Sequence, residues 1–153
     1  MSLNKIVSNN KAADILLERL IGSSINKVTY AITEWTLRII GPNGPEYTLR
    51  AADIELINIG LWRKKVSRLP INIMDTNEPD DVITGAVIFS VVNRWPISKI
   101  QLNDQADLLL GFENNIEITV KAKVDLVDWT WQIDDENGTS IIFCDSGELS
   151  MGL

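Results

Sequence analysis

The chain has 153 residues, 45% hydrophobic and 23% charged, a balance typical of a folded globular protein rather than a disordered one. It contains no histidine and one cysteine, which removes the usual general base, the commonest metal ligand and any internal disulfide. The net charge of −7 is uneven: residues 1–76 carry ten Lys or Arg and seven Asp or Glu, whereas residues 77–153 carry four and fourteen. Such an acidic half repels phosphate backbones and attracts basic proteins, so no nucleic-acid partner is expected.

The sequence gives no sign of membrane insertion or export. No stretch approaches the roughly 20 apolar residues that span a bilayer, and residues 1–8 lack the apolar core of a signal peptide. A single cysteine agrees with a reducing compartment. We therefore expect a cytoplasmic protein without membrane contact.

The first predicted helix covers residues 11–21. Asn9 or Asn10 can cap its start, and Gly22 is placed to end it. Alanine, isoleucine and leucine recur within it at spacings of three and four, which is typical of one buried helix face.

Strands are predicted to follow at residues 25–32 and 34–40, because β-branched and aromatic residues alternate there with polar ones. The Gly-Pro-Asn-Gly-Pro sequence at 41–45 predicts a turn. Residues 47–49 then return as the partner strand, and residues 54–57 indicate one more.

The middle of the chain has mixed character. The basic run at 62–68 includes an aromatic residue, as nucleic-acid patches do, but in an acidic protein it is interpreted as a solvated strand face or as a means of preventing edge-to-edge pairing. The acidic residues 75–81 are expected to form a loop, with Asp80 or Asp81 capping a helix that extends to about Asn93. Its β-branched residues also permit a strand, and the helix is favoured only by the repeat described below.

Five strands are predicted in the second half, at residues 96–102, 108–112, 116–124, 127–133 and 140–144. The last two form a hairpin around Asn-Gly, and residues 146–153 are expected to be an edge or a partly ordered tail.

The alternation in 127–133 puts Trp129 and Trp131 on one face. Both are expected in the core under the helices; if that face is exposed instead, they are interface anchors.

An internal repeat is the main organising feature. Residues 25–28 (Ile-Asn-Lys-Val) are matched by 97–100 (Ile-Ser-Lys-Ile), and 46–51 by 117–122 after a turn shortened by one residue. The expected fold class is α+β in a single domain, 1–153. It comprises two pseudo-repeated units, about 9–58 and 80–127, each a helix followed by antiparallel strands, plus a C-terminal hairpin at 127–145.

Few residues offer chemistry. Cys144 lies in an apolar run and is expected to be a structural residue rather than a nucleophile. The acidic stretch 134–136 has contiguous rather than alternating carboxylates, so it is interpreted as a solvated turn rather than a calcium loop. No phosphate-binding loop is present. We expect no metal, no cofactor and no catalytic residue.

The pattern of residues 25–28, 35–39 (Trp-Thr-Leu-Arg-Ile) and 46–49 (Glu-Tyr-Thr-Leu), with the later Asp-Trp-Thr-Trp strand at 128–131, resembles bacterial immunity proteins of polymorphic toxin systems of the contact-dependent inhibition type. Such proteins often combine a Leu-x-Phe-x-Asn-Gly strand pair with a later Trp strand. Here Leu110, Phe112 and Asn114 fit, while Asn115 replaces the glycine.

The resemblance implies a non-catalytic cytoplasmic protein that binds and neutralises a cognate toxin. An acidic surface suits a basic toxin domain. The alternatives are a homodimeric structural or adaptor module, and a small-ligand-binding or enzymatic pocket between the repeats that uses carboxylates. The residues predicted to contact the toxin are Glu78, Asp80, Asp81, Asp134, Asp135 and Glu136.

Overall fold

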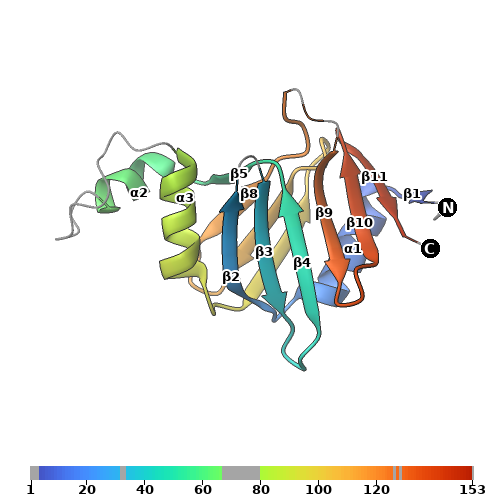
Figure 1. Ribbon diagram of the computed structural model, residues 1–153, viewed down its shortest axis with the longest axis horizontal. Helices are drawn as coiled ribbons and strands as arrows, with labels where there is room; N and C mark the ends of the chain where they lie inside the picture. The colour runs from blue at the N-terminus through green and yellow to red at the C-terminus, as the bar shows by residue number, and fades with distance from the viewer. Residues whose placement is uncertain (1–3, 32–33, 67–79, 126, 128, 153) are drawn as a thin grey trace.

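The computed structural model describes residues 4–31, 34–66, 80–125, 127 and 129–152. In these residues the protein has three α-helices and eleven strands, so the α+β class is confirmed, with sheet predominating (Figure 1). The helices are α1 (Asn9–Leu20), α2 (Ile59–Val66) and α3 (Asp80–Val87), which continues into a π-helical turn, η1 (Ile88–Val92). The strands are β1 (Lys5–Ile6), β2 (Ser24–Ala31), β3 (Glu34–Ile40), β4 (Glu46–Ala51), β5 (Ile54–Leu56), β6 (Ile97–Leu102), β7 (Leu108–Phe112), β8 (Glu117–Val120), β9 (Trp129–Asp135), β10 (Ser140–Asp145) and β11 (Glu148–Met151).

The strands form two antiparallel sheets, and the chain crosses from one sheet to the other at one corner. The seven-stranded sheet has the order β1-β11-β10-β9-β4-β3-β2, and the four-stranded sheet has the order β5-β8-β7-β6. Thus β5 follows β4 in sequence but pairs with β8, while β9 follows β8 but pairs with β4. Hydrogen bonds from Ala52 N to Thr130 O (2.9 Å) and from Lys121 N to Asp53 O (3.1 Å) join the two crossing chains.

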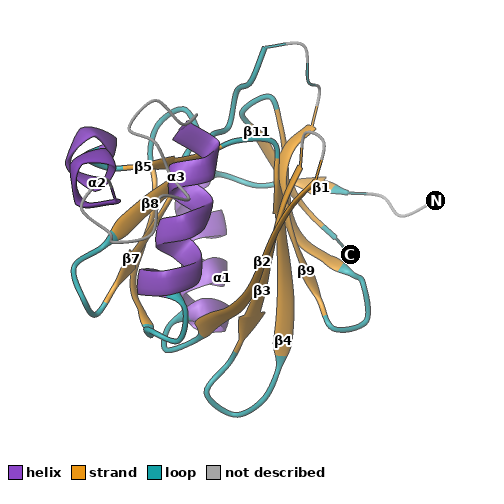
Figure 2. Ribbon diagram, turned by 60° about the vertical axis from the view of Figure 1, so that its left-hand side comes forward, coloured by secondary structure: helices purple, strands orange, loops and turns teal. Residues whose placement is uncertain are grey.

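Helices α1 and α3 each bridge the two sheets. Helix α1 packs on β6 and β11, and α3 packs on β5 and β2 (Figure 2). The buried apolar side chains form one continuous cluster from both sheets and both helices. Among the residues that the structure describes, no helix lies over the other face of the seven-stranded sheet, which explains the apolar–polar alternation along its strands. Within the described residues, no helix is long and apolar enough to cross a membrane.

The predicted first helix is confirmed, with a different cap. Ser8, not an asparagine, is the N-cap, and its Oγ accepts a hydrogen bond from Lys11 N. Asn9 lies inside the helix, and its Nδ2 donates to Asn103 O at 2.8 Å. Ala12, Leu16 and Leu20 are fully buried at four-residue spacing, so one face of α1 covers the core.

The basic run predicted as a strand face is instead mostly helical. Helix α2 covers the run as far as residue 66, and residues 67–68 lie outside the described residues. Asn58, with φ of 62°, starts the helix, and its carbonyl accepts from the N–H groups of Leu61 and Trp62. The unbranched Arg and Lys side chains lose little rotamer freedom in a helix, and cations in the last turn interact well with the helix dipole. The sequence prediction was therefore wrong here.

The helix predicted to begin at Asp80 or Asp81 is confirmed through residue 92. Its last turn is π-helical, with Asn93 N donating to Ile88 O. The Ser90 hydroxyl donates to Ala86 O, and Phe89 points outward with 68% of its surface exposed. Bulky β-branched residues in this turn explain why a strand was also plausible.

The C-terminal hairpin is central rather than appended. Strand β9 pairs with β4, so the hairpin lies in the middle of the seven-stranded sheet. Residues 148–151, predicted to be an edge or tail, form β11 between β10 and the short edge strand β1, which the sequence did not reveal.

The prediction that Trp129 and Trp131 share a core face was wrong. Trp131 is fully buried, but the ring of Trp129 lies 5.9 Å from Cζ of Arg50, on the face without helices. The pairing register of β9 with β10 shifts between Cys144 and Asp145. Because a bulge of this kind interrupts side-chain alternation, the two indoles point to different faces.

A helix followed by three antiparallel strands occurs twice, as α1-β2-β3-β4 and as α3-β6-β7-β8. In the turn after β3, Gly41 N donates to Pro45 O (2.7 Å) and Gly44 N donates to Gly41 O (3.0 Å). The turn at 112–116 has the same two bonds 71 positions later, at 3.0 and 2.9 Å. This shared element order is a likeness of topology, and the internal repeat itself stays a prediction.

Candidate functional site

The acidic residues predicted to contact a partner fall into two separate groups. Asp80 and Asp81 lie in the first turn of α3, while Asp134, Asp135 and Glu136 lie at the end of β9 and in the turn to β10. Glu78 lies outside the described residues.

The pairing of the strands gives the distance between the acidic residues on α3 and those at the β9–β10 turn. Tyr30, whose pKa the nearby Asp81 carboxylate helps to raise, is aligned with Trp131 through β3 and β4, and Trp131 lies four residues from Asp135 on β9. These positions are about 13 Å apart along the strands and about 14 Å across three strand spacings. The acids therefore do not form one continuous surface.

The aspartates at the β9–β10 turn accept hydrogen bonds from neighbouring residues of the same hairpin. Asp135 Oδ1 accepts from the N–H groups of Asn137 and Thr139, both at 2.9 Å. The Asp134 carboxylate accepts from Gln132 Nε2 and from Ser140 Oγ. These bonds shape the turn, as the sequence interpretation of a solvated turn implies.

The group on α3 lies beside a cavity and is joined there by two carboxylates that the sequence analysis missed. A cavity of 370 Å³ opens between β5 and α3, and Asp53, Glu55, Asp80 and Asp81 line it. We call these four residues the acidic corner. Ile54, Leu56, Ile59 and Thr84 complete the wall, so apolar surface lies next to carboxylates. The site thus combines residues from β5 and α3, which are adjacent only in the folded protein.

Two of the four carboxylates have partners of the same chain. Asp80 accepts from the Arg63 guanidinium, with Nε 3.0 Å from Oδ1. Asp81 Oδ1 accepts from Val82 N at 2.9 Å, and burial and the Asp81 carboxylate raise the pKa of Tyr30 above its ordinary value. Helix α3 therefore begins with its carboxylates held at the rim of the cavity.

The other two carboxylates repel one another. Burial, and then the charge of Glu55, raises the pKa of Asp53 above its ordinary value, although Lys121 acts in the opposite direction. The corner has four carboxylates against the nearby cations Arg63 and Lys121, so it is net negative. A carboxylate whose charge is unfavourable in the free protein is typical of a functional site.

The acidic corner is not a metal site by geometry. Among the described residues, no group of three or more His, Cys, Asp or Glu side chains is placed to hold a metal ion. Its carboxylates surround a cavity that is partly apolar, which suits the side chain of a lysine or arginine better than a compact ion.

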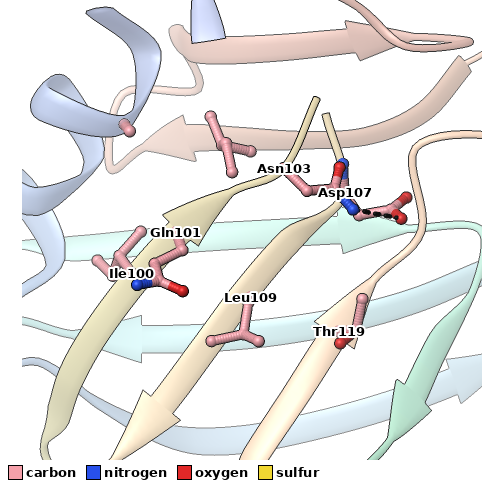
Figure 3. A pocket seen from close by; sticks show the side chains of 8 residues that line it. Ile100, Gln101, Asn103, Asp107, Leu109 and Thr119 are labelled. Carbon is pink, nitrogen blue, oxygen red and sulfur yellow. Dashed lines mark hydrogen bonds between the residues drawn. The ribbon is translucent and has the colours of Figure 1, made fainter. Parts of the chain in front are cut away.

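A second cavity, of 400 Å³, lies where β6 and β7 meet, and Asn103 and Asp107 are among the residues that line it (Figure 3). Asp107 accepts from Ala122 N (2.8 Å), Asn103 Nδ2 (3.0 Å) and Lys121 Nζ (3.4 Å). Burial alone would raise the pKa of Asp107, but these donors outweigh it and lower the pKa. The carboxylate is thus used to hold the 103–107 loop, and we regard it as structural.

Cys144 is fully buried, as its apolar neighbours predicted. The Thr130 hydroxyl lies 3.4 Å from its Sγ, yet burial raises the pKa of the thiol above its ordinary value. A neutral, inaccessible thiol is a poor nucleophile.

Comparisons with protein-family models, with curated proteins and with solved structures find no match for this chain. The functional argument therefore depends on the geometry of the acidic corner.

Proposed function

We propose that this protein is a non-catalytic binding protein of the immunity type, which neutralises a basic toxin domain by accepting one of its Lys or Arg side chains in the acidic corner. The observation that carries the proposal is the cavity between β5 and α3. Its carboxylate rim suits a cationic head group, and its apolar wall suits the methylene stem of the same side chain.

The chain itself supplies an example of this contact. The Arg63 guanidinium lies on Asp80, at the rim of the corner, and donates from Nε and Nη2 to Oδ1. Planar guanidinium groups pair well with carboxylates, and such bonds are stronger than those between neutral groups. Asp53, Glu55 and Asp81 offer further acceptors for an incoming cation.

The long-range field of the protein supports the same partner. Residues 77–153 carry fourteen acidic and four basic residues. A field of this sign accelerates encounter with a basic protein and is weakened by salt.

Binding to the toxin domain encoded next to this protein tests the proposal. We expect Asp81→Asn to slow association and weaken affinity by about tenfold, the range for losing one close charge pair. Glu136→Gln is the matched control, since it changes net charge by the same amount at an exposed position of the other acidic group. Surface plasmon resonance at several salt concentrations measures both constants. Equal losses in the two variants would indicate a bulk charge effect, and no complex with the wild type would remove the proposal.

A second candidate function is binding of a small cationic ligand in the same cavity. The partly buried carboxyl of Asp53 and the 370 Å³ volume favour it, because a cation would offset the repulsion between Asp53 and Glu55. Calorimetric titration with spermidine distinguishes the two functions. Saturable binding of spermidine that is abolished by Asp53→Asn would favour the small-ligand function. If the titration releases or absorbs no heat, the small-ligand function is wrong and binding of a protein partner is favoured.

We also propose that the two helix–strand units are copies related by a pseudo-twofold axis. Supporting this, Gly22 N donates to Ile97 O (2.9 Å) and Arg94 N donates to Ile25 O (3.0 Å). Residue 94 lies 72 positions after residue 22, and residue 25 lies 72 positions before residue 97. Interchanging the two units therefore converts the first hydrogen bond into the second. Reciprocal contacts of this kind are characteristic of twofold symmetry.

Comparison of equivalent positions in the two units predicts a stabilising substitution. Arg94 has a φ of 72° where its counterpart Gly22 has 81°, and this left-handed region costs a non-glycine residue about 1 kcal/mol. We expect Arg94→Gly to raise the free energy of unfolding by up to about that amount, and Gly22→Ala to lower it similarly. A Cβ on Gly22 would meet only Pro42 Cγ, at 3.6 Å, so the cost comes from the backbone. Urea unfolding measures both, and a destabilised Arg94→Gly protein would contradict the prediction.

A further inference from the structure

The acidic corner is too small to hold a protein partner by itself. Its cavity of 370 Å³ suits a single side chain, whereas a stable protein–protein interface covers about 800 Å² on each partner. Most of the contact with a toxin domain must therefore lie on surface that adjoins the corner. Strand β5, which ends next to α3, leads from the corner onto the outer face of the four-stranded sheet, the face turned away from the core.

A row of aligned side chains crosses this outer face from the corner to the second cavity. Glu55 on β5 is paired with Thr119 on β8. Thr119 is paired in turn with Leu109 on β7, and Leu109 with Gln101 on β6 (Figure 3). Glu55 lines the acidic cavity, and the other three line the second cavity. Because paired residues have Cα atoms about 5 Å apart, the two cavities adjoin.

Lys121 provides a second link between the two cavities. Its N–H donates to Asp53 O at 3.1 Å, and its ammonium lies 3.4 Å from Asp107 Oδ2. Asp53 lines the acidic cavity, and Asp107 lines the second cavity. The two cavities are therefore neighbouring hollows of one surface.

The charges of the outer face allow a basic partner to approach. Lys99 is paired with Glu117 at 3.1 Å, and Lys121 is paired with Asp107, so these charges cancel. By contrast, the last turn of α2 carries three basic residues. A basic protein that reaches the corner is therefore accommodated better over the sheet than over α2.

The second cavity combines apolar surface with unused hydrogen-bonding groups. Ala13, Leu102 and Leu109 are half-buried and contribute its apolar part. Within the described part of the chain, neither the Gln101 amide nor the Thr119 hydroxyl is bonded to another protein group. Both groups can donate and accept hydrogen bonds. They suit the peptide groups on either side of an apolar side chain that enters the cavity.

We infer that the toxin domain covers the outer face of the four-stranded sheet, with a basic side chain in the acidic corner and an apolar side chain in the second cavity. This inference rests on the proposed function and adds the remainder of the contact surface. Glu55 and Gln101 are three strand spacings apart, so the two side chains of the toxin lie about 14 Å apart. The toxin main chain between them passes over Thr119.

Surface plasmon resonance with the toxin domain encoded next to this protein separates the two contacts. Leu109→Ser should weaken affinity about tenfold, the value of one buried leucine, through faster dissociation at every salt concentration. Asp81→Asn should instead slow association, and less so at high salt. Ile6→Ser removes an apolar side chain that is 66% exposed on β1 of the other sheet. It is the matched control and should leave the affinity unchanged.

A second variant tests the same surface if Leu109→Ser disturbs the fold. Thr119→Val keeps the shape of the side chain and removes its hydroxyl, so it should weaken binding about fivefold, the value of one hydrogen bond. Amide spectra of the full chain labelled with ¹⁵N show whether each variant is folded. In the wild-type complex, the resonances of Leu109 and Gln101 should shift, whereas that of Phe143, on β10 of the other sheet, should not.

The outcomes separate this inference from the proposed function. If Asp81→Asn weakens binding while Leu109→Ser and Thr119→Val bind as tightly as the wild type, the toxin uses the corner and the inference about the sheet is wrong. A shift at Phe143 with none at Leu109 would place the toxin on the other sheet and would also overturn it. If the wild type forms no complex, the proposed function fails as well.

Discussion

Trp131→Ala is expected to lower the free energy of unfolding by about 3–5 kcal/mol, the range for removing a large aromatic side chain from a core. Trp131 is fully buried on β9, where the chain crosses from one sheet to the other. Its indole Nε1 also donates to Ala106 O at 3.1 Å, and Ala106 is itself fully buried. The substitution therefore leaves both a cavity and an unpaired carbonyl in the interior.

Trp95→Ala is the matched control, because it removes the same side chain from a site that is 45% exposed. Its cost should be below about 1 kcal/mol, since surface substitutions rarely cost more. Urea unfolding followed by far-ultraviolet circular dichroism measures both without depending on tryptophan fluorescence. Similar midpoints for the two variants would show that Trp131 is not the centre of the core.

The second large effect is expected at Asp107. Asp107→Asn should cost about 2–3 kcal/mol at neutral pH, because one carboxylate acceptor becomes a donor that faces other donors. Ala122 N and Asn103 Nδ2 lie 2.8 and 3.0 Å from the Asp107 oxygens, and the ammonium of Lys121 loses its ion pair. Asp104→Asn, in the same loop but exposed, is the control and should be close to neutral.

The pH dependence of this cost has a definite sign. The pKa of Asp107 is lowered in the folded protein, so its charge stabilises the fold above the ordinary value of 3.8, and this contribution is lost as pH falls through the lower folded pKa. The gap in stability between wild type and Asp107→Asn should therefore narrow below about pH 4. A gap that stayed constant down to pH 2 would contradict this account.

Asp53 has the opposite effect on how the free energy of unfolding depends on pH. Burial, and then Glu55, raises its folded pKa, so its contribution to stability is fully present below 3.8 and is lost as pH rises through the folded value. Because Asp53 is only partly buried, solvent screens this effect, and Asp107 should dominate the acid limb.

Local sequence signals were sufficient for much of the fold. Helix α1 and strands β2, β3 and β4 follow from side-chain periodicity and from the turn at 41–45, and each is formed by residues close in sequence. The helix at residues 80–92 was assigned correctly only by comparison with the first unit, because its β-branched residues fit a strand equally well.

The failures have identifiable physical causes. Helix α2 was missed because a short basic run has no apolar periodicity to distinguish helix from strand. The outward orientation of Trp129 depends on a bulge in its pairing with β10, and a bulge is a property of two strands rather than one. Strand β1 has two residues and exists only because β11 lies beside it.

The sequence by itself determined the α+β class, the acidic second half and the absence of histidine, because these depend on composition and on short-range spacing. It also indicated Asp80 and Asp81 as acids at a helix start. Only the tertiary structure decided that these two join Asp53 and Glu55, while Asp134 and Asp135 lie elsewhere. The alternation in β5 already put Asp53 and Glu55 on one face, with Ile54 and Leu56 on the other. Which element that face meets depends on the crossing of β5 into the second sheet, a long-range pairing that no local pattern encodes.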